Sequence, residues 1–157
     1  MNSSETPEQW LKRIESLRRA VDLRLDKEGR WWHEGQPFEH RRLIDAFNCG
    51  IDLHPKTGEP IIRLGQRWCY FSADDTPFIV FQLEEREGDL VATLNTVERL
   101  DLPENGLFIR GACLYANLAP NRWARFSRGA QAKLDAWLEE DPRGGFILQT
   151  AHRVWRI

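Results

Sequence analysis

Apolar and polar residues follow one spacing at the start of the chain and another beyond it. The first apolar positions recur every three or four residues, as on one face of an amphipathic helix: Trp10, Leu11, Ile14 and Leu17. Thr6 and Gln9 have the spacing of a capping box, and Pro7 suits the first helical position. The pattern predicts an N-terminal helix within residues 1–20.

From residue 21 onward, most apolar residues alternate with polar ones or form short runs bounded by Gly, Pro, Asn and Asp. Both patterns are typical of β-strands. Strands are predicted over residues 21–25, 30–34, 61–64, 67–71, 78–83, 90–94, 107–110, 113–117, 146–149 and 153–157. Because short turns separate most neighbouring strands, we expect antiparallel pairing.

Helical spacing returns twice inside the chain. A helix is predicted over residues 38–49, with Gly50 as its C-terminal cap, from the apolar positions Leu43, Ile44 and Phe47. A longer helix is predicted to begin near Pro120 or Asn121. Its apolar face consists of Trp123, Phe126, Ala130, Leu134, Trp137 and Leu138.

These elements predict an α+β fold with mostly antiparallel sheets, an N-terminal helix and one helix in each of two repeated units. The expected organisation is an N-terminal helix over residues 1–20, a first half over residues 21–76 and a second half over residues 77–157. The repeat lies in the pattern of elements, because residue identity between the halves is slight.

Composition narrows the class of protein. The chain has 157 residues, of which 41% are hydrophobic and 29% charged, and this excludes a disordered chain. No apolar run approaches the roughly 18 residues of a membrane span, and the first residues do not resemble a signal peptide. Cys49, Cys69 and Cys113 include no C-x-x-C pair, so we expect buried free thiols in the cytoplasm.

Charge is distributed unevenly. The net charge of −2 argues against a protein that coats a nucleic acid polymer. Residues 1–100 carry 14 basic and 18 acidic side chains (−4), whereas residues 101–157 carry 8 and 6 (+2). Arg122 and Arg125, beside Trp123, would share one face of the predicted long helix. Such a group suits a phosphate or carboxylate attached to a ring, although an exposed face of ion-paired arginines also explains it.

Motifs for catalysis and metal binding are absent. The chain has no P-loop, no dinucleotide-binding glycine motif, no G-x-S-x-G and no H-E-x-x-H. His33 and Glu34 are neighbours in a predicted strand, where their side chains point to opposite faces. Asp74 and Asp75 precede Thr-Pro, as in a turn. No cofactor and no metal are therefore predicted.

One ordered series of short elements resembles the bacterial family of unknown function DUF1285. It comprises Val21–Leu25, Glu28–Phe38, Leu43-Ile44 with Phe47, Asp75–Phe78, Asn95-Thr96, Arg110-Gly111 and Asn121-Arg122. The segment Leu64–Trp68 departs from the family pattern. The resemblance implies a duplicated α+β fold with a second half like a pleckstrin-homology domain. It also implies a groove between the halves for a nucleotide-like ligand and a role in signalling, without established catalytic residues.

The leading hypothesis is a ligand-binding or regulatory module of the bacterial cytoplasm that holds a small anionic, nucleotide-like ligand between its halves. Arg110, Arg122 and Arg125 would contact the charge, and Trp32 or His33 would flank a ring.

Two alternatives stay open. One is a protein-interaction or homo-oligomeric module without a small-molecule ligand, in which an uncovered Trp marks the contact. Trp31 and Trp32 are consecutive in a predicted strand, so one ring faces outward, and we expect the first helix to cover it. The other alternative is an enzyme whose site uses Asp75, His33 or Cys113.

Overall fold

The computed structural model describes residues 5–157 and divides into two compact units, Met1–Asp75 and Thr76–Ile157. Each unit has its own buried apolar residues. Among the described residues there are three α-helices, and all strand pairs except β1–β7 and β8–β13 are antiparallel. The predicted α+β class is therefore confirmed. No helix in this part of the chain is long and apolar enough to cross a membrane.

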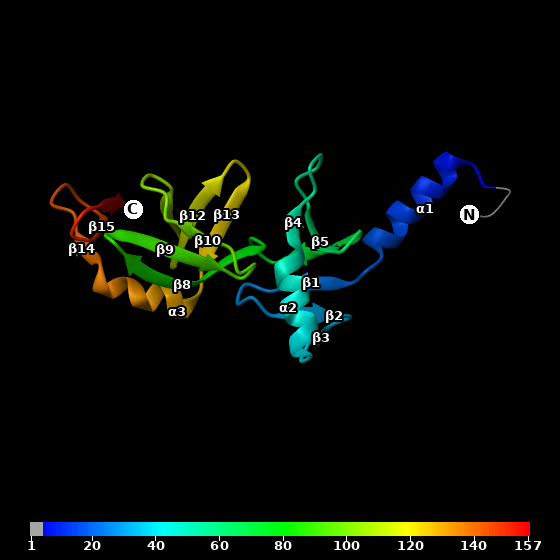
Figure 1. The fold of residues 1–157 in the computed structure, drawn as a ribbon, viewed down its shortest axis with the longest axis horizontal. Coiled ribbons are helices and arrows are strands. Elements are labelled where there is room, and N and C mark those ends of the chain that lie inside the picture. Colours follow the sequence, from blue (N-terminus) through cyan, green and yellow to red (C-terminus); the bar gives the residue numbers. More distant parts are fainter. Residues whose placement is uncertain (1–4) are drawn as a thin grey trace. The chain divides into compact units, whose positions relative to one another are not determined.

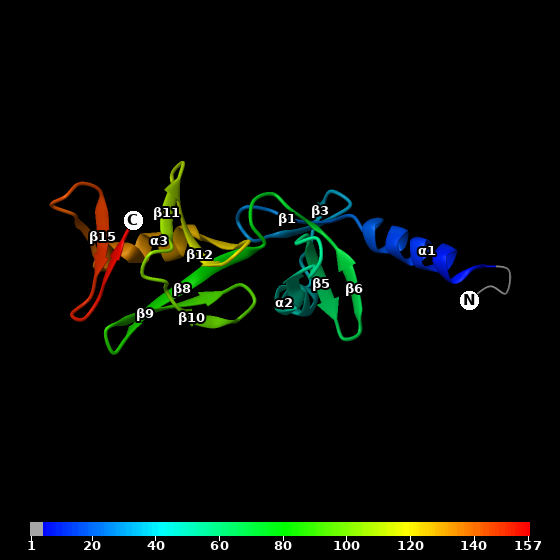
Figure 2. The same cartoon turned by 90° about the horizontal axis from the view of Figure 1, so that it is seen from above.

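Unit 1 contains two helices and two small sheets (Figure 1). The sheets have the orders β3-β2-β1-β7 and β4-β5-β6. The elements are α1 (Pro7–Arg19), β1 (Leu23–Leu25), β2 (Trp31–His33), β3 (Gln36–Pro37), α2 (Arg41–Gly50), β4 (Ile51–Leu53), β5 (Pro60–Leu64), β6 (Arg67–Tyr70) and β7 (Ser72–Ala73). In Figure 2, α2 lies beside β5, against which it packs.

The core of unit 1 forms around Trp31, which is 1% exposed. Its ring packs edge-on against Phe47 of α2 and Phe71, with centroids 5.5 and 4.9 Å apart. Its indole N–H donates to Asn48 Oδ1 at 2.8 Å, so the polar atom of the buried ring is satisfied. Trp31 is thus the inward residue of the Trp31–Trp32 pair.

Helix α1 begins as the sequence predicts. Thr6 Oγ1 accepts from the Gln9 N–H, and Gln9 Oε1 accepts from the Thr6 N–H, which completes the capping box. The last turn of α1 contacts β6, where Arg18 lies over Trp68 and Arg19 over Tyr70, each 4.0 Å from the ring centroid.

Unit 2 is built on a six-stranded sheet of order β10-β9-β8-β13-β12-β11 and a three-stranded sheet of order β14-β15-β16. Figure 1 shows α3 alongside β8, and the two are in contact. The elements are β8 (Phe78–Arg86), β9 (Asp89–Leu94), β10 (Arg99–Asp101), β11 (Leu107–Arg110), β12 (Cys113–Ala119), β13 (Arg122–Phe126), α3 (Arg128–Lys133), the 3-10 helix η1 (Leu134–Ala136), β14 (Leu138–Glu140), β15 (Phe146–Gln149) and β16 (Val154–Arg156).

The predicted long helix that begins near Asn121 is wrong. Its first part is the central strand β13, in which Ala124 and Phe126 are buried with the period of two that a strand requires. Ser127 then accepts a hydrogen bond from the Ala130 N–H and starts the short helix α3. The sequence showed a helical spacing because the buried Phe126 of β13 stands four positions before the buried Ala130 of α3.

Two smaller expectations also change. Gly50 is the last residue of α2 rather than its cap, and a Cβ there would meet the Arg63 carbonyl oxygen at 2.3 Å, so close approach of β5 requires the glycine. Cys69 and Cys113 are partly buried free thiols, but Cys49 is exposed. Burial raises the pKa of the Cys69 thiol.

Candidate functional site

Trp32 and His33, predicted to flank a ring, lie on β2 of unit 1. The Trp32 ring is partly exposed and its indole N–H donates to Asp26 Oδ2 at 2.9 Å. The Arg24 guanidinium lies 5.1 Å from the ring centroid and pairs with Asp74 at 2.5 Å. His33 stacks on Phe38 with centroids 5.7 Å apart. Arg24, rather than the first helix, therefore lies over the outward tryptophan.

Asp26 organises the hairpin that carries Trp32. Its carboxylate accepts from the backbone N–H groups of Glu28 and Arg30, both at 2.9 Å, and from the Arg30 side chain at 3.1 Å. Burial alone would raise the pKa of this carboxyl, but the hydrogen bonds from Trp32 and from the two backbone groups outweigh it and hold the pKa below its usual range. The Asp26 carboxylate is thus a structural anion.

The three predicted arginines all belong to unit 2, but they do not share one face. Arg122 and Arg125 stand three apart on the strand β13, so their side chains point to opposite faces of the sheet. The Arg122 guanidinium donates to both Glu98 carboxylate oxygens, at 3.0 and 2.6 Å, and lies 4.5 Å from the Phe78 ring centroid. Its charge is therefore already matched within the unit.

Arg110 lies in a different environment. Its guanidinium is 5.3 Å from the centroid of Trp123 and 5.7 Å from that of Tyr115. The Phe108 ring stacks on Tyr115 at 5.3 Å and meets Trp123 edge-on at 5.6 Å. We call Phe108, Arg110, Tyr115 and Trp123 the arginine–aromatic group.

Strand register brings this group together. Phe108 pairs with Tyr115 across β11 and β12, and Tyr115 pairs with Arg125 across β12 and β13, so these side chains share one face of the sheet. Arg125 therefore lies on the same face as Arg110, whereas Arg122 does not, so the predicted shared face of Arg122 and Arg125 is wrong.

The arginine–aromatic group combines charge with an accessible ring. Trp123 is 41% exposed. Arg110 is exposed and makes no ion pair with any residue in the described range 5–157. A guanidinium presents five N–H donors in a plane that matches phosphate and carboxylate oxygens, and an exposed indole face accepts a second flat ring. The group can therefore hold an anion and a ring side by side.

Phe108 and Tyr115 were missed as site residues, although their strands were predicted. The signal was the alternation in the predicted strands over 107–110 and 113–117, which already places Phe108 with Arg110 and Tyr115 with Cys113 on shared faces. The pairing with Trp123 was hidden because its segment was assigned to a helix. Within residues 5–157, no group of three or more His, Cys, Asp or Glu could hold a metal ion.

The two units, with mostly antiparallel sheets and few helices, define an α+β protein whose fold recurs in solved structures. Two of these are DUF1285 family proteins. The one from Silicibacter pomeroyi DSS-3 has a TM-score of 0.66 and 18% sequence identity, and the match covers 87% of this chain and 79% of that chain. The one from Shewanella baltica OS155 has a TM-score of 0.57 and 12% identity, and the match covers 74% and 92%.

These comparisons confirm the resemblance to DUF1285 at the level of the fold. No protein-family model and no curated protein matches the chain. Whether one ligand contacts residues of both halves stays a prediction, and the arginine–aromatic group of unit 2 is the candidate site that the geometry supports best.

Proposed function

We propose that this protein is a regulatory module of the bacterial cytoplasm that binds a small anionic molecule with a flat ring, such as a nucleotide, at the arginine–aromatic group. The observation that carries the proposal is Arg110: it is exposed, lies over Trp123, and has no carboxylate partner within the described residues. The mild positive charge of residues 101–157 also favours an anion.

The chemistry of such a complex follows from the two side chains. A phosphate or carboxylate would accept two parallel hydrogen bonds from the Arg110 guanidinium, which are stronger than neutral ones. The ring of the ligand would stack on the exposed face of Trp123, a contact worth about 1–3 kcal/mol for a nucleobase. A molecule with only one of these groups would bind more weakly.

A thermal-shift panel tests this combination of charge and ring. The probes are AMP, adenosine, ribose 5-phosphate and inorganic phosphate. AMP is expected to stabilise the protein most, by about 2.7 kcal/mol at 100 times its Kd. Equal shifts from AMP and adenosine, or no shift from any probe, would contradict the proposal.

Two substitutions locate the site and a third is the matched control. Arg110→Gln should weaken AMP binding about tenfold or more, because a charge-assisted hydrogen bond is worth about 1.5–3 kcal/mol. Trp123→Leu should weaken binding of AMP but leave ribose 5-phosphate unchanged. Arg122→Gln removes an arginine of the opposite face that already pairs with Glu98, so AMP binding should persist.

A second candidate function, self-association, is favoured by helix α1. None of its 13 residues is buried, and Leu11 and Leu17 are 60% and 58% exposed. An isolated helix of this length is marginal in water, so a second copy of the helix that covers this face would stabilise it. The acidic Glu8 in the first turn and the basic Arg18 in the last turn are complementary in an antiparallel pair.

Sedimentation equilibrium tests self-association. Leu17→Lys should shift a dimer toward monomer. Leu43→Lys changes a residue of α2 that is 42% exposed, and it should leave the mass unchanged. A monomer at every concentration would exclude this candidate and leave the ligand-binding proposal unaffected.

A further inference from the structure

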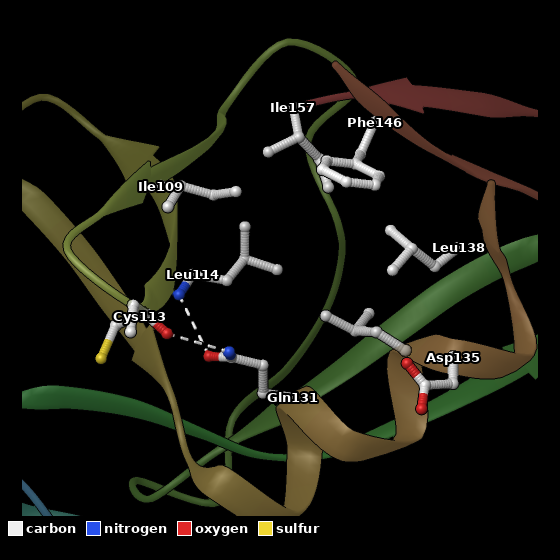
Figure 3. Close-up of a pocket in the computed structure, with 10 residues that line it drawn as sticks. Ile109, Cys113, Leu114, Gln131, Asp135, Leu138, Phe146 and Ile157 are labelled. Carbon is white, nitrogen blue, oxygen red and sulfur yellow. Dashed lines mark hydrogen bonds between the residues drawn. The ribbon is translucent and has the colours of Figure 1, made fainter. Parts of the chain in front are cut away.

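A cavity lies on the other face of the strands that carry the arginine–aromatic group. Ile109 precedes Arg110 on β11, and its side chain points to the opposite face, where it lines a cavity of about 300 Å³. The wall consists of side chains from β11, β12, α3, η1, β14 and β15 together with Ile157 (Figure 3). This cavity lies wholly within unit 2.

The wall of the cavity is mainly apolar, and several of its side chains are incompletely covered. Ile109 is 55% exposed, Phe146 44% and Leu138 37%. Leu114 and Leu134 form its deeper part and are each 4% exposed. Apolar surface that stays in contact with water inside a hollow is favourable to cover, so the cavity suits an apolar group.

The one polar side chain in the depth of the cavity has its hydrogen bonds satisfied. Gln131 Nε2 donates to the Ala112 carbonyl oxygen and Gln131 Oε1 accepts from the Leu114 N–H, both at 3.1 Å (Figure 3). These bonds tie α3 to the β11–β12 turn and fix the shape of the cavity floor. Gln131 is therefore a wall residue rather than a ligand for a bound molecule.

Asp135 is the single charged residue among those that line the cavity. It is exposed, and it forms no ion pair within the described residues 5–157. A positive group beside Asp135 could keep part of its water shell, which avoids the cost of burying a charge. The mouth of the cavity therefore favours a cation, while the interior favours an apolar body.

Size restricts the ligand further. A cavity of about 150 Å³ is large enough for benzene. A volume of about 300 Å³ thus has room for one ring or a branched aliphatic group with a short chain that reaches the mouth. A larger flat molecule would extend into solvent.

We infer that this cavity binds a small amphiphilic cation, an ammonium group on an aromatic or aliphatic body, with the ammonium at Asp135 and the body among Ile109, Leu138 and Phe146. The site differs in position and in ligand charge from the arginine–aromatic group. The two proposals can therefore fail separately.

Titration of the ¹⁵N-labelled full chain, followed by NMR, tests the inference with three probes of similar shape: 2-phenylethylamine, 2-phenylethanol and 3-phenylpropionate. The amine should bind best, the alcohol about threefold more weakly, and the carboxylate weakest. The amide signals that shift should be those of Ile109, Leu114, Leu134 and Leu138. The carboxylate is a decisive probe because Asp135 also lines a neighbouring hollow together with Arg125 and Arg128, which would attract an anion.

Three variants separate charge from apolar contact. Asp135→Asn should abolish the preference for the amine over the alcohol and leave the affinity for the alcohol unchanged. Phe146→Ala should weaken all three probes. Phe81→Ala, which removes a ring of similar exposure (40%) that does not line the cavity, should change none of them.

Three results would overturn the inference: amide shifts that lie outside the cavity, binding of the carboxylate as strong as that of the amine, or an amine preference that survives Asp135→Asn. Arg110→Gln serves as a further control, because it disrupts the arginine–aromatic group and should leave amine binding intact.

Discussion

Arg19 in unit 1 and Arg110 in unit 2 each lie over a tyrosine ring, yet their surroundings differ. Arg19 donates to both carboxylate oxygens of Glu59, at 2.9 and 3.0 Å, and to Glu15 at 3.2 Å. Hydrogen bonding to Glu59 raises the pKa of Arg19 above its usual value and lowers that of Glu59. Arg110 has no such carboxylate within residues 5–157.

The difference teaches that an arginine over an aromatic ring is not by itself a ligand site. In unit 1 the same residue types fasten a helix to a sheet, because acidic residues complete the group. In unit 2 no described carboxylate pairs with the Arg110 guanidinium, and under the proposed function its donors would bind an external anion. Four substitutions test the contacts behind this contrast, and they are ordered by the expected effect on stability.

The largest effect is expected at Asp26, the carboxylate that holds Arg30 and Trp32. Asp26→Asn would place an amide N–H group, or a weaker acceptor, against donors of Arg30 and Trp32, and should destabilise the protein by about 2 kcal/mol at pH 7. Urea unfolding followed by circular dichroism measures the change. Asp22→Asn, at an exposed position of the same segment, is the control.

The difference in unfolding free energy between wild type and Asp26→Asn should also depend on pH, and the pKa of Asp26 fixes the direction. Because the pKa of Asp26 is lowered on folding, its contribution is complete above the unfolded value of about 3.9 and is lost as the pH falls through the lower folded value. The stability difference between wild type and Asp26→Asn should therefore shrink below about pH 4. A difference that stays constant down to pH 2 would contradict the role of the ionised carboxylate.

The next effect concerns the strand that makes the arginine–aromatic group possible. Ser127 caps α3, so Ser127→Ala should cost about 1 kcal/mol. In a continuous helix that begins near Asn121, position 127 would be internal and alanine would be stabilising. A lower melting temperature of the variant would therefore show that β13 and α3 are separate elements, and a higher one would indicate a continuous helix. Ser16→Ala, at an exposed internal position of α1, is the control, since alanine there should be neutral or slightly stabilising.

A local effect is expected from Glu59→Gln, which removes the negative charge and one of the two Glu59 oxygens that accept from Arg19. The amides of α1 should exchange with deuterium severalfold faster, while those of β5 and β6 change little. Glu39→Gln changes an exposed carboxylate of unit 1 outside α1 and should not alter exchange of the α1 amides. If both variants exchange alike, Glu59 does not fasten the helix.

The smallest effect on stability is expected for Arg110→Gln. An exposed arginine without an acidic partner contributes little to folding, so the change should lie within about 0.5 kcal/mol. The same substitution should markedly reduce the thermal shift produced by AMP. Loss of stability by more than about 1 kcal/mol would mean that Arg110 serves its own unit, as Arg19 does.

Local signals predicted much of the fold. The capping box and apolar face of α1 were readable because all their contacts lie within a few residues. The alternation in β9, where Leu90, Ala92 and Leu94 are buried, was readable for the same reason. β13 was not, because Trp123, Phe126 and Ala130 fit the helical period whereas the buried Ala124 and Phe126 fit the strand period. The pairing partners that decide between the two lie elsewhere in the chain.

The residue types of the candidate site could be predicted, but not which particular residues form it. Arginine beside an aromatic residue was visible in the segment Arg122–Arg125. Arg122 is paired because Glu98 lies beside it in the fold. Glu98 is 24 positions away along the chain, and no local spacing predicts this pair. Trp32 was expected to flank a ligand ring, and the sequence did not indicate that Asp26 and Arg24 contact it.

The sequence by itself determined the α+β class, the start of α1, most strand positions and the uneven charge of the chain, because each depends on residues close together along it. Only the tertiary structure decided that Arg110 meets Trp123, that Arg122 faces the other way, and that Ile109 and Phe146 line one cavity. These relations depend on strand register and on the pairing of distant segments, where a shift of one residue moves every side chain to the opposite face.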